Sequence, residues 1–497
     1  MKRYPLASKI ITLLALVFIL LLPVSAIMNM IDERASYREE VVRQISSSTS
    51  GKQILVGPIL VIPYKYKYWE LEPQTDDTRT EKVYVEKTRR ANYYVLPETL
   101  DANTQLRVES RHLGIYQAQV YESETTFSGQ FSIPIIAEMD AANIEVGQPY
   151  LSVGIADARG IRDIPQLVID HANDVTASDE TFPSPTSRTV PFQAGTAIPS
   201  MPSGLHAPVS LVSYQRPQKF TYSFKLSLQG TSSLAVVPIG ETSSYSLKGD
   251  WPHPNFLGNF LPTHRDISDT GFNARWSSTW LASEMNNHLR VLGTNDCGFN
   301  NTRDCKNASS IDIQRLPAFY TSLVETVDQY QLNERSVKYA FLFIGLTFIA
   351  FFLMEVLKNL RVHPVQYILV GAALILFYLL LLALSEHVGF DLAYLAASAA
   401  CVGLITYYVS HVLGGFRRGL GFGALLTTLY GSLWGLLQSV DNALLLGSLM
   451  LFAVLALVMI ITRKLDWYRL SDNALTRGDE ALFDETLLDK TLFDDEK

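Results

Sequence analysis

The sequence is poor in charge, and the shortage is confined to two regions. Charged residues make up 18% of the chain, whereas an average soluble domain has about 25%. The depleted regions are residues 10–31 and 339–461, and the segment between them has the composition of a water-soluble domain. This distribution predicts a membrane protein that carries a large soluble domain between its membrane-spanning segments.

Several motifs of catalysis and of nucleic-acid binding are also missing. The sequence has no phosphate-binding glycine loop, zinc-protease motif or nucleophile elbow. The sequence also lacks a stripe of basic residues, which would indicate a nucleic-acid-binding surface. We therefore expect a chain that is not an enzyme, that binds no nucleic acid and that needs no cofactor or metal.

Six apolar stretches are long enough to cross a membrane as helices. A helix needs about 20 apolar residues to span the hydrocarbon core, where every backbone polar group must be bonded internally. None of the stretches has a charge at its centre, which disfavours an ion- or proton-coupled transporter. The six stretches are residues 10–31, 339–357, 365–384, 392–413, 420–437 and 443–461.

The first stretch has two interpretations. Its basic start, its apolar run over 10–22 and the small residues Ser25 and Ala26 resemble a cleavable signal peptide. The apolar character continues through Ile31, which favours a retained anchor. In either case, we expect the residues that follow to be exported.

Two features of the later stretches concern packing. Glu355 lies near one end of its stretch, and we expect its carboxylate to extend toward Lys358 at the membrane surface. The glycines of 414–423 lie at a membrane boundary and do not follow a strand, so we expect them to permit close packing of helices.

The placement of Lys and Arg predicts the orientation. The short segments 385–391 and 438–442 contain neither residue, whereas the segments at the opposite ends of the stretches do. We therefore expect a multi-pass protein of the bacterial inner membrane, with both termini cytoplasmic. The expected parts are an anchor (1–31), a periplasmic β-rich domain (32–337), a five-helix transmembrane domain (338–465) and an acidic cytoplasmic tail (466–497).

Strand patterns dominate the expected periplasmic domain. Residues 219–228 alternate polar and apolar side chains, which is the period of a half-buried strand. Many short strands separated by Gly, Pro and Asn turns are typical of an antiparallel sandwich. The proline-rich segment 174–204 is interpreted as a loop or linker, or as a binding flap. Further strands are expected at 64–68, 83–85, 93–96, 127–136, 150–155, 234–239 and 272–276, and helices at 35–45 and 318–331.

Two groups of residues in this domain are candidates for a site. Trp251, His253 and His264 lie in a block rich in aromatic residues and proline, so they either line a site or close the core. Asp157 and Arg159 directly follow a strand. They either bind a ligand or form an ion pair that fixes the turn.

Two further pairs have a functional and a structural interpretation. Glu386 and His387 lie at the outer end of the third stretch, where they either relay protons or are ordinary interfacial residues. Cys297 and Cys305 are separated by seven residues, most of them polar. In a periplasm they are expected to form a disulfide, and two free thiols or a metal-binding pair are the alternatives.

Several blocks of sequence lie along nearly the whole chain: Glu33-Arg-Ala-Ser-Tyr-Arg38, Ser48-Thr-Ser-Gly51, Val56-Gly-Pro58, Asp157-Ala-Arg-Gly160, 251–276, Asp328-Gln-Tyr-Gln-Leu332, His363-Pro364 with Gln366-Tyr367, and 381–390. Together they resemble the CreD family of inner-membrane proteins, also called cell envelope integrity proteins. Residues 174–204, the Cys297–Cys305 segment and the acidic tail are unlike that family. The resemblance implies an association with a two-component envelope response, colicin tolerance and β-lactam response, and it supplies no catalytic residues.

Three functions are therefore compatible with the sequence. The first is a non-enzymatic protein of envelope maintenance and stress response, whose exported domain binds a cell-wall component or an envelope protein. The second is a small-molecule permease or a lipid-handling protein of the bilayer. The third is an envelope hydrolase that uses His253 or His264.

The orientation can be tested with reporter fusions. Fusions after Asn255 and within 385–391 should report an extracytoplasmic location, and fusions within 358–362, within 414–418 and at the C-terminus should report a cytoplasmic one. A cytoplasmic signal from the Asn255 fusion would contradict the predicted orientation.

Overall fold

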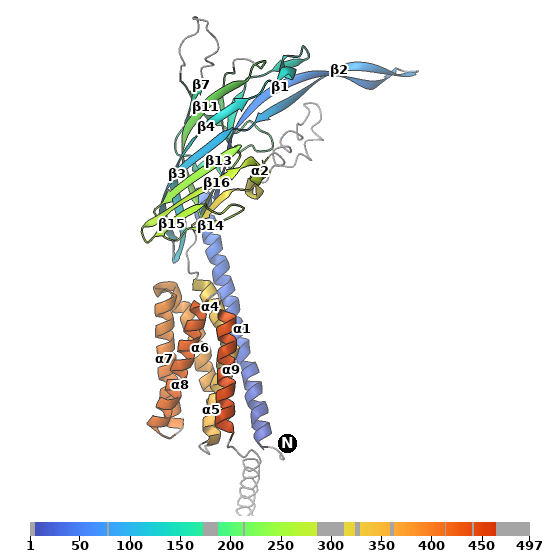
Figure 1. Cartoon of the computed structure of the whole chain (residues 1–497). Helices are drawn as coiled ribbons and strands as arrows, with labels where there is room; N and C mark the ends of the chain where they lie inside the picture. Colours follow the sequence, from blue (N-terminus) through green and yellow to red (C-terminus); the bar gives the residue numbers. More distant parts are fainter. Residues whose placement is uncertain are drawn as a thin grey trace, which may run out of the picture. The chain divides into compact units, whose positions relative to one another are not determined.

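The computed structural model describes residues 5–76, 79–171, 187–211, 214–285, 313–323, 329–357, 362–412, 414–439 and 442–463. The chain divides into two compact units. The β unit comprises Glu39–Thr326, and the helical unit combines Met1–Arg38 with Val327–Lys497 (Figure 1). The predicted fold class is thus confirmed: an N-terminal apolar helix, a large β-rich region and a set of C-terminal apolar helices.

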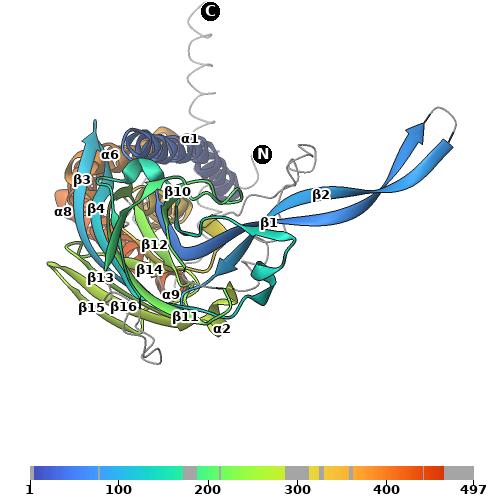
Figure 2. The same cartoon turned by 90° about the horizontal axis from the view of Figure 1, so that it is seen from above.

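The described strands of the β unit form two sheets (Figure 2). The nine-stranded sheet has the order β14 (Asn255–Leu257), β17 (Phe319–Ser322), β12 (Ser233–Val237), β1 (Gln53–Asp76), β6 (Tyr150–Ile155), β10 (Gly204–Pro208) and β9 (Gln193–Ala194), with β2 (Arg79–Val95) and β5 (Ile144–Val146) also paired to β1. The eight-stranded sheet has the order β15 (His264–Ser268), β16 (Gly271–Thr279), β13 (Thr242–Gly249), β3 (Thr99–Leu113), β4 (Tyr116–Ile133), β11 (Gln218–Thr231), β7 (Gln166–His171) and β8 (Arg188–Pro191).

The sheets are mainly antiparallel, as the sequence predicts for a sandwich. Two pairings are parallel: β1 with β12, and β3 with β13. Each joins strands that are far apart in the sequence, so the parallel pairs need long connections. Local alternation cannot reveal such pairings.

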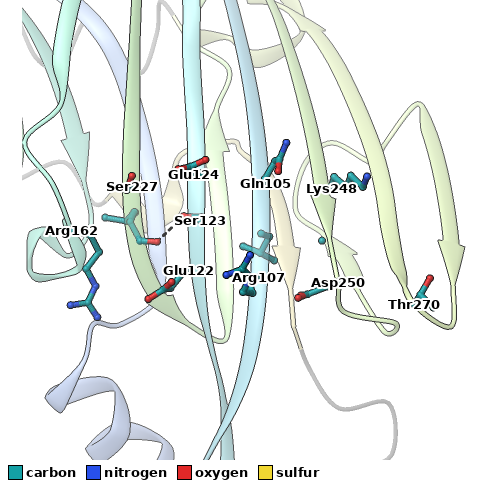
Figure 3. Close-up of a pocket in the computed structure, with 13 residues that line it drawn as sticks. Gln105, Arg107, Glu122, Ser123, Glu124, Arg162, Ser227, Lys248, Asp250 and Thr270 are labelled. Carbon is teal, nitrogen blue, oxygen red and sulfur yellow. Dashed lines mark hydrogen bonds between the residues drawn. The ribbon is translucent and has the colours of Figure 1, made fainter.

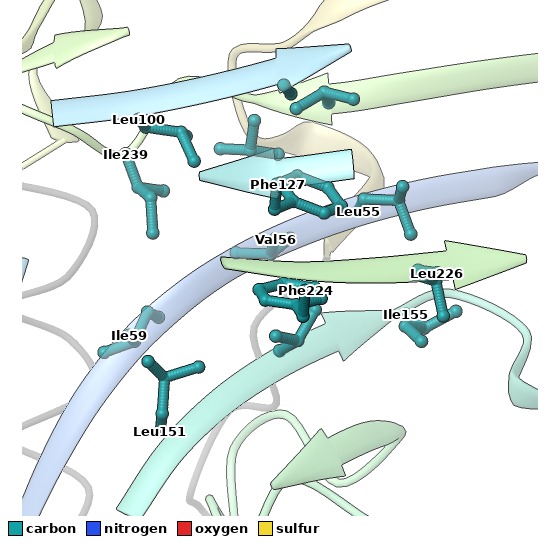
Figure 4. Close-up of a cluster of buried hydrophobic side chains, with 14 of the residues drawn as sticks. Leu55, Val56, Ile59, Leu100, Phe127, Leu151, Ile155, Phe224, Leu226 and Ile239 are labelled. Carbon is teal, nitrogen blue, oxygen red and sulfur yellow. The ribbon is translucent and has the colours of Figure 1, made fainter. Parts of the chain in front are cut away.

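The hydrophobic core lies between the two sheets (Figure 4). Strand β3 shows the reason, because its side chains alternate strictly between buried and exposed from Leu100 to Arg107. Aromatic rings stack across strands on the buried face, with Phe127 and Phe224 having ring centroids 5.0 Å apart. Strand β1 contributes side chains to the same core, among them Val56 and Ile59.

Two local predictions need correction. Within the segment interpreted as a loop or linker (174–204), the described part contains strands β8 and β9, which join opposite sheets. Proline and serine hid these short strands because they interrupt the apolar period. The predicted helix at 318–331 is also wrong in part: β17 occupies Phe319–Ser322, and helix α4 (Gln329–Lys338) begins later. The short helix α2 (Trp280–Ser283) follows β16.

Six described helices are long and apolar enough to cross a membrane. They match the six predicted stretches, and the helix predicted at 35–45 is the continuation of the first of them. Their bounds are α1 (Pro5–Ser48), α5 (Ala340–Leu357), α6 (Pro364–Val388), α7 (Phe390–Val412), α8 (Phe416–Gln438) and α9 (Ala443–Thr462).

A buried ion pair joins α1 to the rest of the helical unit. Lys9 of α1 contacts the carboxylate of Glu355 in α5, whose side chain is only 6% exposed. The same carboxylate accepts hydrogen bonds from the Val362 amide at 3.0 Å and from the Tyr367 hydroxyl at 2.9 Å. Glu355 is therefore held inside the unit. The expectation that it extends to the membrane surface is wrong, because a buried carboxylate is tolerated where it is paired and fully hydrogen-bonded.

Small residues allow two close helix contacts. A Cβ on Gly371 would lie 2.3 Å from a methyl carbon of Leu20, so this glycine lets α1 approach α6. Gly419 and Gly423 likewise face Ser410 and Thr406 of α7. The structure thus confirms the predicted packing role for Gly419 and Gly423, whereas a Cβ on Gly414 or Gly421 would meet nothing within 4 Å.

The Lys9–Glu355 pair makes a testable contribution to stability. Lys9→Met leaves Glu355 buried without its cation, and we expect a loss of about 2–4 kcal/mol, reduced from the fully buried case because Lys9 is partly exposed. Arg43→Met is the matched control, because the Arg43–Glu40 pair on α1 is exposed and should cost less than about 1 kcal/mol. Thermal unfolding of the full chain in detergent measures both. Equal effects of the two variants would contradict a structural role for the buried pair.

Candidate functional site

A polar hollow lies on the eight-stranded sheet. Its volume is about 870 Å³, and its lining comes mainly from β3, β4, β11 and β13 (Figure 3). Strand alternation places one side chain in two outside the core, and on these strands the outward side chains are polar or charged. The polar lining residues are Gln105, Arg107, Glu122, Ser123, Glu124, Arg162, Ser227, Lys248, Asp250 and Thr270.

Some charges of the hollow are satisfied by the protein itself. Asp250 accepts a hydrogen bond from the Val108 amide at 2.8 Å, and Glu124 pairs with Lys225 at 2.7 Å. Arg162 donates to the side chain of Gln229. These contacts fix three of the charged side chains that line the hollow.

Arg107, Glu122 and Lys248 are the remaining charged residues of the hollow. In the part of the chain that the structure describes, no ion pair joins any of them to another residue. Arg107 lies directly opposite Glu122 in the β3–β4 register, and Lys248 lies opposite Gln105 in the β13–β3 register. The hollow therefore presents both signs of charge beside amide and hydroxyl groups, an arrangement suited to a polar ligand with donors and acceptors.

Asp157 and Arg159, both candidates from the sequence, lie elsewhere in the β unit. The Arg159 guanidinium donates to both oxygens of Asp157, at 2.9 and 2.6 Å, and also to the Ser47 carbonyl at 2.8 Å. Asp157 additionally accepts the Gly51 amide at 2.9 Å. The pair thus binds the last turn of α1, where a cation is favoured by the helix dipole. This geometry favours the structural interpretation.

The pKa of Asp157 reports the same contacts. The hydrogen bonds from Arg159 are the main cause that lowers this pKa from 3.8 to about 2, and partial burial opposes them. The carboxylate is therefore the form that the folded chain stabilises.

The tryptophan and histidine candidates are not brought together into a site. Trp251 donates from its indole to the His253 carbonyl at 3.0 Å and packs partly against the core. His253 is exposed just before β14, whereas His264 is exposed at the start of β15, in the other sheet. Other aromatics of the block close the core, with Trp276 stacked on Tyr245 at 5.2 Å. The arrangement favours the interpretation that this block is structural.

Glu386 and His387 have different environments. The Glu386 side chain is 10% exposed, accepts a hydrogen bond from the Tyr330 hydroxyl at 3.1 Å and lies 4.0 Å from Arg34 of α1. His387 is exposed and contacts the backbone carbonyl of Ala383. The two neighbours therefore do not form a carboxylate–imidazole pair, and Glu386 joins three helices instead.

Two predictions lie outside the described residues. These are the disulfide between Cys297 and Cys305 and the acidic tail. Within the described residues, no group of three or more His, Cys, Asp or Glu has the arrangement of a metal site.

The sequence interpretation missed the residues of the hollow. Arg107, Glu122 and Lys248 lie on β3, β4 and β13, and neither β3 nor β13 was among the predicted strands. A usable signal existed, because Gln105-Leu-Arg107 alternates polar and apolar residues. Charged residues on alternate positions of a strand would have indicated its outer face.

Together, the helices and the sandwich define a multi-span membrane protein with a large β unit. The family model described as "Inner membrane protein CreD" matches residues 5–468. The protein "Inner membrane protein CreD" of Escherichia coli (strain K12) is 38% identical over 485 residues, which cover 98% of this chain and 99% of that protein. The chain therefore belongs to the CreD family of inner membrane proteins, as the sequence blocks predicted.

A weak likeness to a solved structure was also found. The structure is the secretin InvG of the Salmonella SPI-1 type III secretion injectisome in its open gate state. It is 12% identical, and the match covers 40% of this chain and 63% of the InvG chain. The TM-score is 0.07, so this likeness indicates neither fold nor function.

The Asp157–Arg159 contact leads to a prediction about pH. Because the folded pKa is depressed, the stability from Asp157 is present above pH 4 and is lost as the pH falls toward 2. Asp157→Asn should therefore cost about 1 kcal/mol at neutral pH, a value discounted because Arg159 is largely exposed. Thermal unfolding of both chains at pH 7 and near pH 2.5 measures it. A difference that persists unchanged at low pH would contradict the role of the carboxylate.

Proposed function

We propose that this protein is a non-enzymatic inner-membrane protein of envelope maintenance that binds a polar cell-wall component in the hollow of its eight-stranded sheet. The observation that carries the proposal is the presence of Arg107, Glu122 and Lys248 in a hollow of about 870 Å³ without ion-pair partners among the described residues. A ligand that offers both a carboxylate and an amine, with amide and hydroxyl groups between them, satisfies all three charges.

A peptidoglycan fragment has this chemistry. Its sugars supply hydroxyl and acetamido groups, and its stem peptide supplies carboxylates and an amine. Arg107 and Lys248 suit the carboxylates, because guanidinium and ammonium groups form charge-assisted hydrogen bonds to them. Glu122 suits the amine, while Gln105, Ser227 and Thr270 provide neutral partners.

The location of the β unit is part of the proposal. The Lys and Arg residues of the short segments favour cytoplasmic termini, and we therefore propose that the β unit lies in the periplasm, where the cell wall lies. The buried Lys9–Glu355 contact supports a first span that is retained, because removal of α1 would leave Glu355 unpaired in the helical unit. With the first span retained, membrane spans both precede and follow, in the sequence, the β unit that carries the hollow.

The envelope hydrolase has less support than binding. The two histidines proposed for it are exposed, with His253 just before a strand of one sheet and His264 at the start of a strand of the other, whereas a general base must be within reach of its nucleophile or water. The permease has no buried charge at the centre of a described span. Binding in the hollow is therefore the function that we place first.

Binding can be measured with soluble muropeptides and the full chain in detergent. Arg107→Ala combined with Lys248→Ala should weaken binding at least about tenfold, because two charge-assisted contacts are lost. The effect should also fall as salt is raised, since both contacts are partly exposed.

Lys219→Ala is the matched control for this measurement. Lys219 pairs with Glu98 at 3.1 Å on the same sheet but does not line the hollow. The control should bind as the unsubstituted chain does. Equal affinity of all three chains for muropeptides would refute the proposed site.

A further inference from the structure

The longest hairpin of the β unit extends beyond the sheet that it starts from. Strands β1 and β2 pair continuously from Leu60–Val95 to Asp76–Arg79 (Figure 2). The other partners of β1, namely β5, β6 and β12, pair with it only as far as residue 66. Beyond that residue the hairpin is a two-stranded ribbon, here called the β1–β2 ribbon (residues 67–76 and 79–88). A two-stranded ribbon alone is marginally stable in water.

The ribbon exposes large apolar side chains. Trp69 is 65% exposed, Tyr84 63% and Leu71 47%. Leu71 and Tyr84 are directly opposite in the register, and Trp69 lies two residues from Leu71, so all three occupy one face. Exposed aromatic and aliphatic residues on a narrow ribbon are typical of a contact surface.

The outer edge of β2 is open along the ribbon. Among the described strands, β2 pairs only with β1. The Lys67 amide donates away from β2, to the Asn143 carbonyl at 2.9 Å, which identifies Lys67–Thr88 as a pair without mutual hydrogen bonds. Because such pairs alternate in antiparallel strands, Glu86, Tyr84 and Lys82 direct their backbone N–H and C=O groups to the open edge.

The sequence along this edge is complementary to itself. Residues 80–88 read Thr-Glu-Lys-Val-Tyr-Val-Glu-Lys-Thr. If a second β2 runs antiparallel with Tyr84 opposite Tyr84, then Lys82 lies opposite Glu86 and Val83 lies opposite Val85. The same register places Glu opposite Lys and Thr opposite Thr at the two ends. Opposite charges and β-branched pairs at facing positions stabilise a sheet.

Neighbouring registers lose this match. A two-fold axis moved to Val83 places Glu86 opposite Thr80, and an axis moved to Val85 places it opposite Tyr84. A two-fold axis that passes through a residue pairs the outward backbone groups of one copy with those of the other. An axis that passes between two residues does not. The register centred on Tyr84 satisfies both the hydrogen bonds and the charges.

We propose that a second copy of this chain docks on the β1–β2 ribbon, with the two β2 strands paired antiparallel about a two-fold axis at Tyr84. The pairing converts two ribbons into one four-stranded sheet, which is large enough to be stable by itself. Tyr84 and Leu71 of the two copies then form one continuous apolar row. The proposal does not depend on the hollow, which lies on the other sheet.

Charge reversal tests the register in full-length chains that carry two different tags and are co-expressed in the same cells. Lys82→Glu places Glu opposite Glu86 at two symmetric positions, so co-purification should fall at least about tenfold. Glu86→Lys alone should do the same. When Lys82→Glu chains are co-expressed with Glu86→Lys chains, both contacts are again attractive, and we expect association to recover.

Lys225→Glu is the matched control. Lys225 is an exposed lysine that pairs with Glu124, and its strand β11 has neighbours on both edges, so strand addition cannot occur there. This reversal should leave co-purification unchanged. The comparison separates a loss of strand pairing from a general effect of adding negative charge.

Disulfide formation gives a second measurement that leaves the charges in place. Chains with Val83→Cys and chains with Val85→Cys should cross-link to each other on oxidation, because facing residues without mutual hydrogen bonds have Cα atoms about 4.5 Å apart. The unsubstituted chain corrects for its own cysteines. Unsubstituted copies that do not associate would overturn the proposal, and so would a failure of the two charge variants to recover together. A Val83–Val85 cross-link no stronger than the background would overturn the register.

Discussion

Gln53 is buried at the point where helix α1 ends and strand β1 begins, and the rest of the β unit is built around this junction. Its side-chain amide donates to the carbonyls of Asp157 and Gln229, at 2.9 and 3.0 Å, and accepts the Asp157 amide at 3.2 Å. An unsatisfied amide in this position would cost about 1–3 kcal/mol. Gln53 thus fixes the start of a central strand, and the register of its neighbours follows from that position.

The sequence predicts features that depend on neighbouring residues, and the structure adds contacts between residues that are far apart in the chain. Residues 150–155 were predicted as a strand with the observed bounds, because the apolar residues Leu151, Val153 and Ile155 recur at every second position. The Asp157–Arg159 pair is also local. The contact of Arg159 with Ser47 crosses 112 positions, and that of Lys9 with Glu355 crosses 346, so no periodicity could reveal either. The alternation at Gln105–Arg107 could have indicated one strand of the hollow, but the meeting of four strands there depends on long-range pairing that no local pattern shows.

The two surfaces that we propose differ in physical character. The hollow presents charges of both signs on strands that are paired on both sides, so a ligand there meets a rigid surface. The β1–β2 ribbon offers backbone groups and apolar side chains on a projecting hairpin, which suits the addition of another strand. A soluble ligand and a second chain can therefore be bound by one β unit without competing for the same residues.

The parallel pairing of β1 with β12 has a consequence for biogenesis. Val56 pairs with Val237, so the partner strand of β1 leaves the ribosome only after about 180 further residues, or roughly 10–40 s at ordinary rates of synthesis. Until then the apolar run at 54–62 has no partner on that side. An unpaired apolar strand of this kind is prone to aggregation until its partner strand has been synthesised. Correct assembly therefore requires that the nascent chain be kept from other unpaired strands for about a third of its synthesis.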